Sequence, residues 1–302
     1  MGIHISVPGS ELTTLAAVYQ LTPYRFLHFT CRNYTFVYSI SMSDAYSDKN
    51  MTTREVLARL PSVFSVDDVR RVSQWEDSRV WVETRRWVQR GWATRLRRGV
   101  YSLHVMGRSY PLDLVEALHV VQPSALAYWT ALGYHHLTEQ LPPTVIIQTP
   151  TPGRTITTSI RELQVRIVHV QPSRFWGITS LAAEDGTIAV TTPEKTILDC
   201  LDRLDLCGGI VEVAKAIKTG AHILSPAAMA RVALRYDSDV VRRRLLVLAL
   251  LLDWHPSWLA ARIPVASTAG YAWFDPTAPH KILSRSTRLY INVATEDIVN
   301  AE

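Results

Sequence analysis

Arginine and glutamine side chains recur at helical spacing in the stretch 78–90 and could do the chemistry of base recognition. One helix face would carry four residues at i, i+3, i+7 and i+10, with two arginines beside it: Arg79, Val82, Arg86 and Gln89, flanked by Arg85 and Arg90. Arginine pairs with guanine O6 and N7, and glutamine pairs with adenine N6 and N7. This face could therefore contact base edges in the major groove of DNA.

A helix that could position these side chains is predicted by the apolar residues of the same stretch. Ser78 to Arg90 contains a stripe at i, i+4 and i+7 that two further residues widen: Val80, Thr84 and Trp87, with Trp81 and Val88. The tryptophan-rich side of the helix, with Trp92 beyond it, is expected to belong to the core rather than to stack on bases. Gly91 ends the helix, because glycine readily adopts a positive φ.

A basic β-hairpin is predicted directly after this helix. Two strand-like segments, 92–96 and 100–103, flank a turn that contains Gly99. Three arginines of this hairpin are expected to hold phosphates: Arg95, Arg97 and Arg98. A cationic helix followed by a basic hairpin is typical of a winged helix-turn-helix, in which the helix enters the major groove and the wing lies on the backbone.

Two short capped helices are predicted before the cationic helix. Thr53 can cap the first, which Pro61 ends. Ser65 begins a second N-cap with acids in its first turn, and that helix should run to about Val72. Residues 51–110 are therefore predicted to form a winged helix-turn-helix domain.

The distribution of charge agrees with this assignment. The chain of 302 residues carries a formal net charge of +5. Residues 51–110 hold twelve arginines, no lysine and six acidic residues, a net charge of +6, so the remainder sums to −1. The net positive charge therefore lies in the predicted DNA-binding segment, as a nucleic-acid partner requires.

The remaining bulk features indicate a globular protein that we expect in the cytoplasm. Three cysteines without a CxxC spacing support neither a disulfide framework nor a zinc site. The longest apolar run, 245–252, is too short to cross a bilayer, and no signal peptide opens the chain. Residues 1–50 show scattered aromatics without a sustained pattern. They are expected to be an N-terminal extension, either a genuine or disordered arm or sequence upstream of a true start at Met42 or Met51.

A larger mixed α/β domain that ends in helices is predicted for residues 111–302, which makes the whole chain α+β. Helices are expected at 112–121, 125–132, 226–236 and 239–253, with another that begins at Pro193, and strands at 144–149, 164–170 and 188–191. A terminal strand, 288–293, is expected to pair back onto the sheet. Three arginines at the start of the last helix could meet an acidic partner or a phosphate, although a solvated turn is the simpler interpretation: Arg242, Arg243 and Arg244.

Possible catalytic residues have simpler structural explanations. Asp185 with Glu194 and Lys195 faintly resembles the acid and lysine set of metal-dependent nucleases, but Pro193 marks a helix start that Glu194 would cap. Three aspartates at i, i+3 and i+6 could bind a metal ion, yet an exposed acidic helix face is the default: Asp199, Asp202 and Asp205.

His135 and His136 have no second cluster of ligands at metal spacing, so a loop role is expected for them. The sequence contains no P-loop, GxGxxG or GxSxG motif. We therefore predict no enzyme activity, no metal site and no cofactor.

The segment from Phe64 to Leu103 resembles the N-terminal winged-helix domain of AbiEi-type antitoxins, from type IV toxin–antitoxin systems. Its most typical part is RGWATRLRRGVY, residues 90–101. Further motifs follow in the family's order, including SALAYWTALGYHHLTEQ at 124–140 and TPEKTILD at 192–199, so that the resemblance covers 64–252. His136 stands where the family usually has glycine, so the local turn could differ.

This resemblance implies an antitoxin that is also a transcriptional repressor. It implies binding to an inverted-repeat operator upstream of its own operon, possible dimerisation on that DNA, and negative autoregulation. It further implies that residues 111–302 counteract a nucleotidyltransferase-fold toxin, whether or not the two proteins touch. The alternatives are a stand-alone winged-helix transcription factor and a metal-dependent nucleic-acid enzyme.

Overall fold

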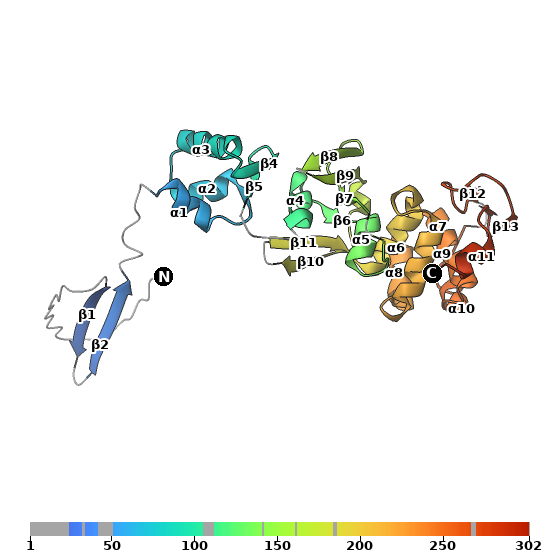
Figure 1. Cartoon of the computed structure of the whole chain (residues 1–302). Helices are drawn as coiled ribbons and strands as arrows, with labels where there is room; N and C mark the ends of the chain where they lie inside the picture. The colour runs from blue at the N-terminus through green and yellow to red at the C-terminus, as the bar shows by residue number, and fades with distance from the viewer. Residues whose placement is uncertain are drawn as a thin grey trace.

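The chain is a mixed α/β protein (Figure 1). The computed structural model describes residues 24–31, 34–41, 51–104, 112–140, 142–160, 162–183, 186–266 and 270–301. Among these residues, no helix has both the length and the apolar character needed to cross a membrane.

Two antiparallel strands lie in the segment for which the sequence predicted no regular pattern. They are β1 (Tyr24–Cys31) and β2 (Tyr34–Ser41). An alternation was present in β2 and was overlooked, since Tyr34, Phe36 and Tyr38 are separated by single residues. The other residues of 1–50 lie outside the described part, and the interpretation of this segment as an arm or as upstream sequence stays a prediction.

Three helices and a three-stranded antiparallel sheet form the unit 51–104, which we call the N-terminal unit. Its elements are α1 (Thr53–Arg59), β3 (Val63–Ser65), α2 (Val66–Ser73), α3 (Asp77–Gln89), β4 (Ala93–Arg97) and β5 (Val100–Leu103), with the strand order β3-β5-β4. The predicted helices and the two later strands are confirmed to within one or two residues. Strand β3 was missed, because three residues are too few to show an alternation.

Local hydrogen bonds explain where these helices begin and end. Thr52 and Ser65 each form a capping box with the acid three residues later. The first cap is therefore one residue earlier than expected. Gly91 has a φ of +70° directly after α3, as predicted.

Aromatic packing forms the core of the N-terminal unit. Trp87 is fully buried, and its ring centroid lies 6.1 Å from that of Phe64 and 6.4 Å from that of Trp75. The expectation for the other two tryptophans was wrong, since Trp81 is 43% and Trp92 is 41% exposed. The apolar stripe of α3 is narrower than the sequence suggested.

A six-stranded mixed sheet forms the centre of the second part of the chain. Its strands are β6 (Ala125–Leu126), β7 (Thr144–Thr149), β8 (Ile156–Ile160), β9 (Leu163–His169), β10 (Ile178–Ala183) and β11 (Gly186–Thr191), in the order β10-β11-β6-β7-β9-β8. The prediction of one helix over 125–132 was partly wrong, because Leu126 pairs with Ile147 and Val190 in this sheet. The helix there, α5, is Tyr128–Tyr134.

Helices pack around the sheet and continue beyond it to the C-terminus (Figure 1). They are α4 (Leu112–Val120), α6 (Pro193–Asp202), α7 (Ile210–Thr219), α8 (Pro226–Arg235), α9 (Asp239–Leu251), α10 (Pro256–Ala260) and α11 (Thr295–Val299), with 3-10 turns at Pro172–Arg174, Leu204–Leu206 and Gly220–His222. The predicted helices α4, α6, α8 and α9 are confirmed.

The last strands form a separate small sheet. It contains β12 (Ala272–Trp273), β13 (Ser284–Ser286) and β14 (Leu289–Ile291), in the order β12-β14-β13. The expected terminal strand therefore exists, but the prediction that it joins the main sheet was wrong. Its partners come from the adjacent segments of the chain.

The solvated-turn interpretation of the arginines of α9 is wrong for two of them, because Arg243 and Arg244 are buried. Arg243 does have an acidic partner, since its Nε lies 2.9 Å from Asp239 Oδ2 within the same helix. Arg243 is 3% and Arg244 is 6% exposed. Arg243 Nη1 donates to the carbonyl of Arg288 at 3.0 Å, and Arg244 Nη2 donates to that of Trp273 at 2.8 Å. Arg242 donates to a carbonyl at the end of α8. These side chains therefore fasten α9 to its neighbours.

Candidate nucleic-acid interface

The outward line of α3 carries Val82, Arg85 and Gln89. These residues fall at i, i+3 and i+7 on the side opposite the buried Val80 and Trp87, and all three are exposed. The helix therefore presents an apolar group, a guanidinium and an amide in one row. Arg85 takes the central position that the sequence analysis had given to Arg86.

The arginines on the flank of α3 make local contacts. Arg86 Nη1 lies 2.7 Å from Glu83 Oε1. The guanidinium of Arg79 lies 4.2 Å from the ring centroid of Trp75. That of Arg90 lies 5.0 Å from the ring centroid of Trp92. All three arginines are exposed, so they add positive potential beside the outward line.

A hollow of about 750 Å³ lies between α3 and the β4–β5 hairpin. We call it the α3 hollow, and it is lined by Trp81, Val82, Arg85, Val88, Gln89, Arg95, Arg98 and Tyr101. None of these eight residues is acidic, and in the described part of the chain its three arginines form no ion pair. Three guanidinium groups without a carboxylate make this hollow suited to a polyanion.

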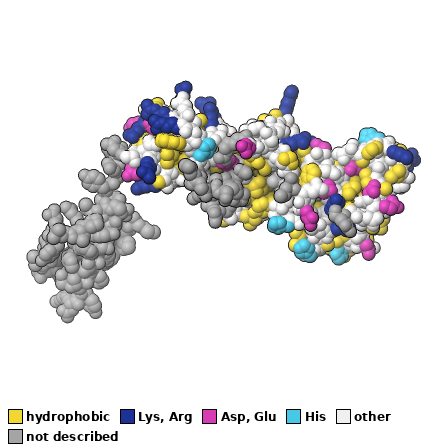
Figure 2. Space-filling view, viewed as in Figure 1, with side chains coloured by type: hydrophobic (Ala, Val, Ile, Leu, Met, Phe, Trp, Pro, Cys, Tyr) yellow, Lys and Arg dark blue, Asp and Glu magenta, His cyan; other side chains and the backbone are white. Residues whose placement is uncertain are grey.

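Basic side chains gather on the N-terminal unit. Figure 2 shows dark blue side chains gathered over the helices of the N-terminal unit, in the same orientation as Figure 1. The exposed arginines on this unit include Arg85, Arg86, Arg90, Arg95 and Arg98. The charge imbalance counted in the sequence is thus concentrated in space as well as along the chain.

Arg97 differs from the other predicted phosphate contacts because it faces the second part of the chain. A β-bulge shifts the register of the hairpin, so that Arg95 pairs with Tyr101 while Arg97 pairs with Val100. Since neighbouring residues of β5 face opposite sides of the sheet, Arg95 and Arg97 point in opposite directions. The sequence gives no sign of this bulge.

The end of α4 holds the side chain of Arg97. Its Nε donates to the carbonyl of His119 and its Nη2 donates to Gln122 Oε1, both at 3.1 Å. The buried Ser102 on β5 also donates to Glu116 of α4, which is fully buried. The hairpin is therefore braced against α4, and Arg97 is a positioning residue in this structure.

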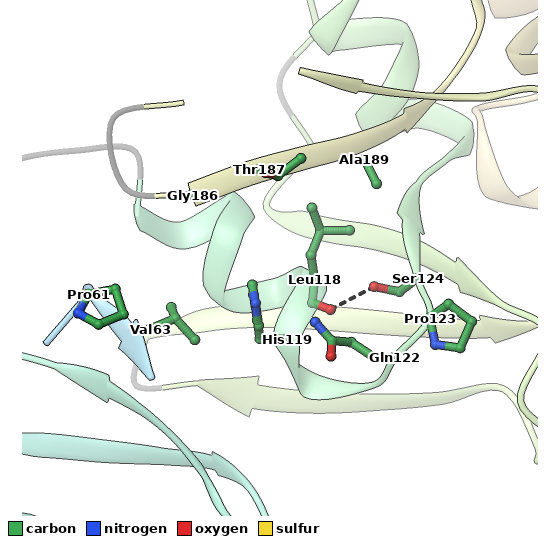
Figure 3. Close-up of a pocket in the computed structure, with 10 residues that line it drawn as sticks. All are labelled: Pro61, Val63, Leu118, His119, Gln122, Pro123, Ser124, Gly186, Thr187 and Ala189. Carbon is green, nitrogen blue, oxygen red and sulfur yellow. Dashed lines mark hydrogen bonds between the residues drawn. The ribbon is translucent and has the colours of Figure 1, made fainter. Parts of the chain in front are cut away.

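A second hollow, of about 730 Å³, lies at this junction (Figure 3). Pro61 and Val63 of the N-terminal unit face Leu118, His119 and residues 122–124 across it, with Gly186, Thr187 and Ala189 completing the lining. Ser124 Oγ donates to the Leu118 carbonyl at 2.7 Å, as the dashed line marks. The described lining contains neither a carboxylate nor a cysteine, and it brings no acid–base pair together.

The residues considered for catalysis are mostly engaged in structure. Glu194 lies in the first turn of α6, as predicted, and its Oε1 accepts from the backbone N–H of Ser225 at 3.1 Å. His135 Nε2 lies 2.6 Å from the carbonyl oxygen of Thr191, and burial lowers the pKa of this histidine. Asp185 lies outside the described residues. Among all the described residues, no cluster of three His, Cys, Asp or Glu side chains could hold a metal ion.

The three aspartates near the end of α6 do not share an exposed face, which corrects the default interpretation. Asp199 is buried and pairs with the fully buried Lys195 one turn earlier. Burial raises the pKa of Asp199, and the ammonium of Lys195 opposes that rise. Asp205 lies beyond α6 and pairs with Arg203 at 2.8 Å.

Comparisons with known proteins add little to this geometry. Neither a protein-family profile nor a curated protein sequence matches the chain. One similar solved structure is described as the crystal structure of the RV2827C protein from Mycobacterium tuberculosis. It is 16% identical, with a TM-score of 0.48, over 75% of this chain and 86% of that chain. The functional interpretation therefore rests on the residues of this chain.

Proposed function

We propose that this chain is a DNA-binding transcriptional regulator. In this proposal, residues 51–110 form a winged helix-turn-helix, with α3 as the recognition helix and the β4–β5 hairpin as the wing. The observation that carries the proposal is the α3 hollow, where Arg85, Arg95 and Arg98 converge without an acid. Phosphate contacts fix the position of a protein on DNA, and side chains in the groove supply specificity.

We further propose that the regulator is an AbiEi-type antitoxin. The sequence resemblance supports this assignment, through motifs that continue from the N-terminal unit to residue 252. The chain would repress its own operon from an inverted repeat, as a homodimer on the DNA. Residues 111–302 would counteract a nucleotidyltransferase-fold toxin, and the protein would act in the cytoplasm without catalytic activity or a cofactor.

A DNA footprint upstream of the gene tests the regulatory part of the proposal. We expect wild-type protein to protect a discrete inverted repeat, and we expect Arg85→Ala to lower the preference for that site over random DNA by at least about fivefold, because one base contact is lost. Arg231→Ala is the matched control, because Arg231 is an exposed arginine on α8. Equal binding of wild type to both DNAs would contradict the assignment.

Co-expression tests the antitoxin part separately. If the neighbouring gene encodes a nucleotidyltransferase, its toxicity should be relieved by the full chain. Arg85→Ala should still relieve it when expressed from an independent promoter, because the two functions are assigned to different parts of the chain. Operator binding without relief of toxicity would instead favour a stand-alone transcription factor.

A further inference from the structure

Two large apolar side chains of α3 are exposed in the α3 hollow, beside its three arginines and a glutamine. Val82 is 48% and Trp81 is 43% exposed, whereas Val80 and Trp87 on the same helix are fully buried. Both exposed side chains line the α3 hollow beside Arg85. Neither side chain belongs to the buried core of the N-terminal unit, so both are available to a partner.

We infer that Val82 reads the methyl group of a thymine in the operator. The C5-methyl of thymine is the apolar group that base pairs present in the major groove, and it is contacted by apolar side chains. Val82 stands in the outward line of α3, where base edges would lie. This inference rests on the proposed function, and it adds thymine to the bases that α3 would recognise.

The spacing along the outward line gives the order of the contacts. At about 1.5 Å of rise per residue, Arg85 lies about 4.5 Å and Gln89 about 10.5 Å from Val82 along the helix axis. Base pairs follow one another at about 3.4 Å, so the three side chains reach over about four consecutive base pairs. Arginine selects guanine and glutamine selects adenine. Each half-site should therefore contain a thymine close to a guanine, with an adenine farther along in the same direction.

Trp81 is the second exposed apolar side chain that lines the hollow. It lies one residue before Val82, so it points about 100° away around the helix, and it shares the hollow with Arg95 and Arg98. Those two arginines would hold the phosphates of the DNA strand that passes Trp81. The indole would exclude water from the edge of the thymine contact and so strengthen it.

Deoxyuridine substitution tests this inference, because it removes only the thymine methyl group. Each thymine of the footprinted half-site is replaced in turn, and binding is measured by fluorescence anisotropy. We expect one or two positions at which wild-type protein binds about fourfold more weakly, which corresponds to the loss of one buried methyl group. At those positions Val82→Ala should bind thymine and deoxyuridine alike.

A matched control separates this effect from a general loss of apolar surface. Val265 is also exposed and lies far along the chain, in the segment after α10. Val265→Ala should keep the full difference between thymine and deoxyuridine. Both variants should have the melting temperature of the wild-type protein, because each removes two methyl groups from an exposed position.

Four outcomes would overturn the inference. A specific complex that is indifferent to deoxyuridine at every position would refute the thymine contact alone. A full deoxyuridine effect in Val82→Ala, or a change of that variant in oligomeric state instead of in base preference, would assign Val82 to another role. Failure of wild type to prefer the upstream fragment over random DNA would remove the proposed function and the inference together.

Discussion

Replacement of Lys195 by methionine should destabilise the C-terminal part of the chain strongly. Lys195 is fully buried on α6, and its Nζ pairs with Asp199 one turn later. The same ammonium lies 5.2 Å from the ring centroid of Trp176 and 5.1 Å from that of Tyr236. Tyr236 donates a hydrogen bond to Asp199 Oδ1 at 3.1 Å. Methionine would fill much of the volume but would leave a buried carboxylate without a cation.

The size of the effect follows from that unpaired charge. Removal of one partner from a buried ion pair costs about 3–5 kcal/mol. For a domain of this size, each kcal/mol lowers the melting temperature by about 2–4 °C. We therefore expect a decrease on the order of 10 °C in thermal denaturation at pH 7. Lys215→Met is the control, because the Lys215–Glu212 pair is partly exposed and its loss should cost under about 1 kcal/mol.

The pH dependence supplies a second readout. Burial raises the pKa of Asp199 above that of the unfolded chain, so the stability linked to its protonation is present at low pH and decreases as the pH rises through the folded-state pKa. Without Lys195 the pKa should rise further. The loss of stability in Lys195→Met, relative to wild type, should then become smaller as the pH is lowered from 7 to 5. The double variant Lys195→Met/Asp199→Leu should regain stability, because it no longer buries a carboxylate. A variant as stable as wild type, or a deficit independent of pH, would refute this reasoning.

Three further predictions concern the wing and the backbone. Arg97→Ala and Gln122→Ala should each weaken operator binding by about fivefold in anisotropy titrations, since each removes the Arg97–Gln122 hydrogen bond, one of those that brace the hairpin against α4; wild-type affinity for Gln122→Ala would contradict the role of this bond. Ser65→Ala should lower the free energy of unfolding by about 1 kcal/mol in urea, because the capping box of α2 is lost. Gly177→Ala should cost about 1–2 kcal/mol in the same assay, because Gly177 has a φ of +63° and the new Cβ would lie 3.2 Å from Lys195 Cγ.

Helices with strong local signals were predictable from the sequence. Ser65 with Asp68 defines the start of α2, and Gly91 defines the end of α3, because capping and positive φ depend on residues close in the chain. Short strands were not predictable. Strand β6 has two residues that take their pairing from β7 and β11, which lie far along the chain.

The candidate interface was only partly predictable, for the same physical reason. The cationic helix and hairpin could be recognised from spacing and charge. The β-bulge that turns Arg97 away from Arg95 depends on pairing between strands, and no residue type signals it. The burial of Lys195 and Arg244 was also hidden, because charged side chains are normally exposed unless distant partners satisfy them.

The salt dependence of DNA binding tests the central claim most directly. Each phosphate contact steepens the fall of log K with log salt by about 0.9. Arg95→Ala/Arg98→Ala should therefore flatten the slope by about two for each bound protomer, and so by about four for the proposed homodimer on its operator. Arg85→Ala should instead weaken the preference for the operator over random DNA. An unchanged slope in the double variant would show that the α3 hollow does not hold the DNA backbone.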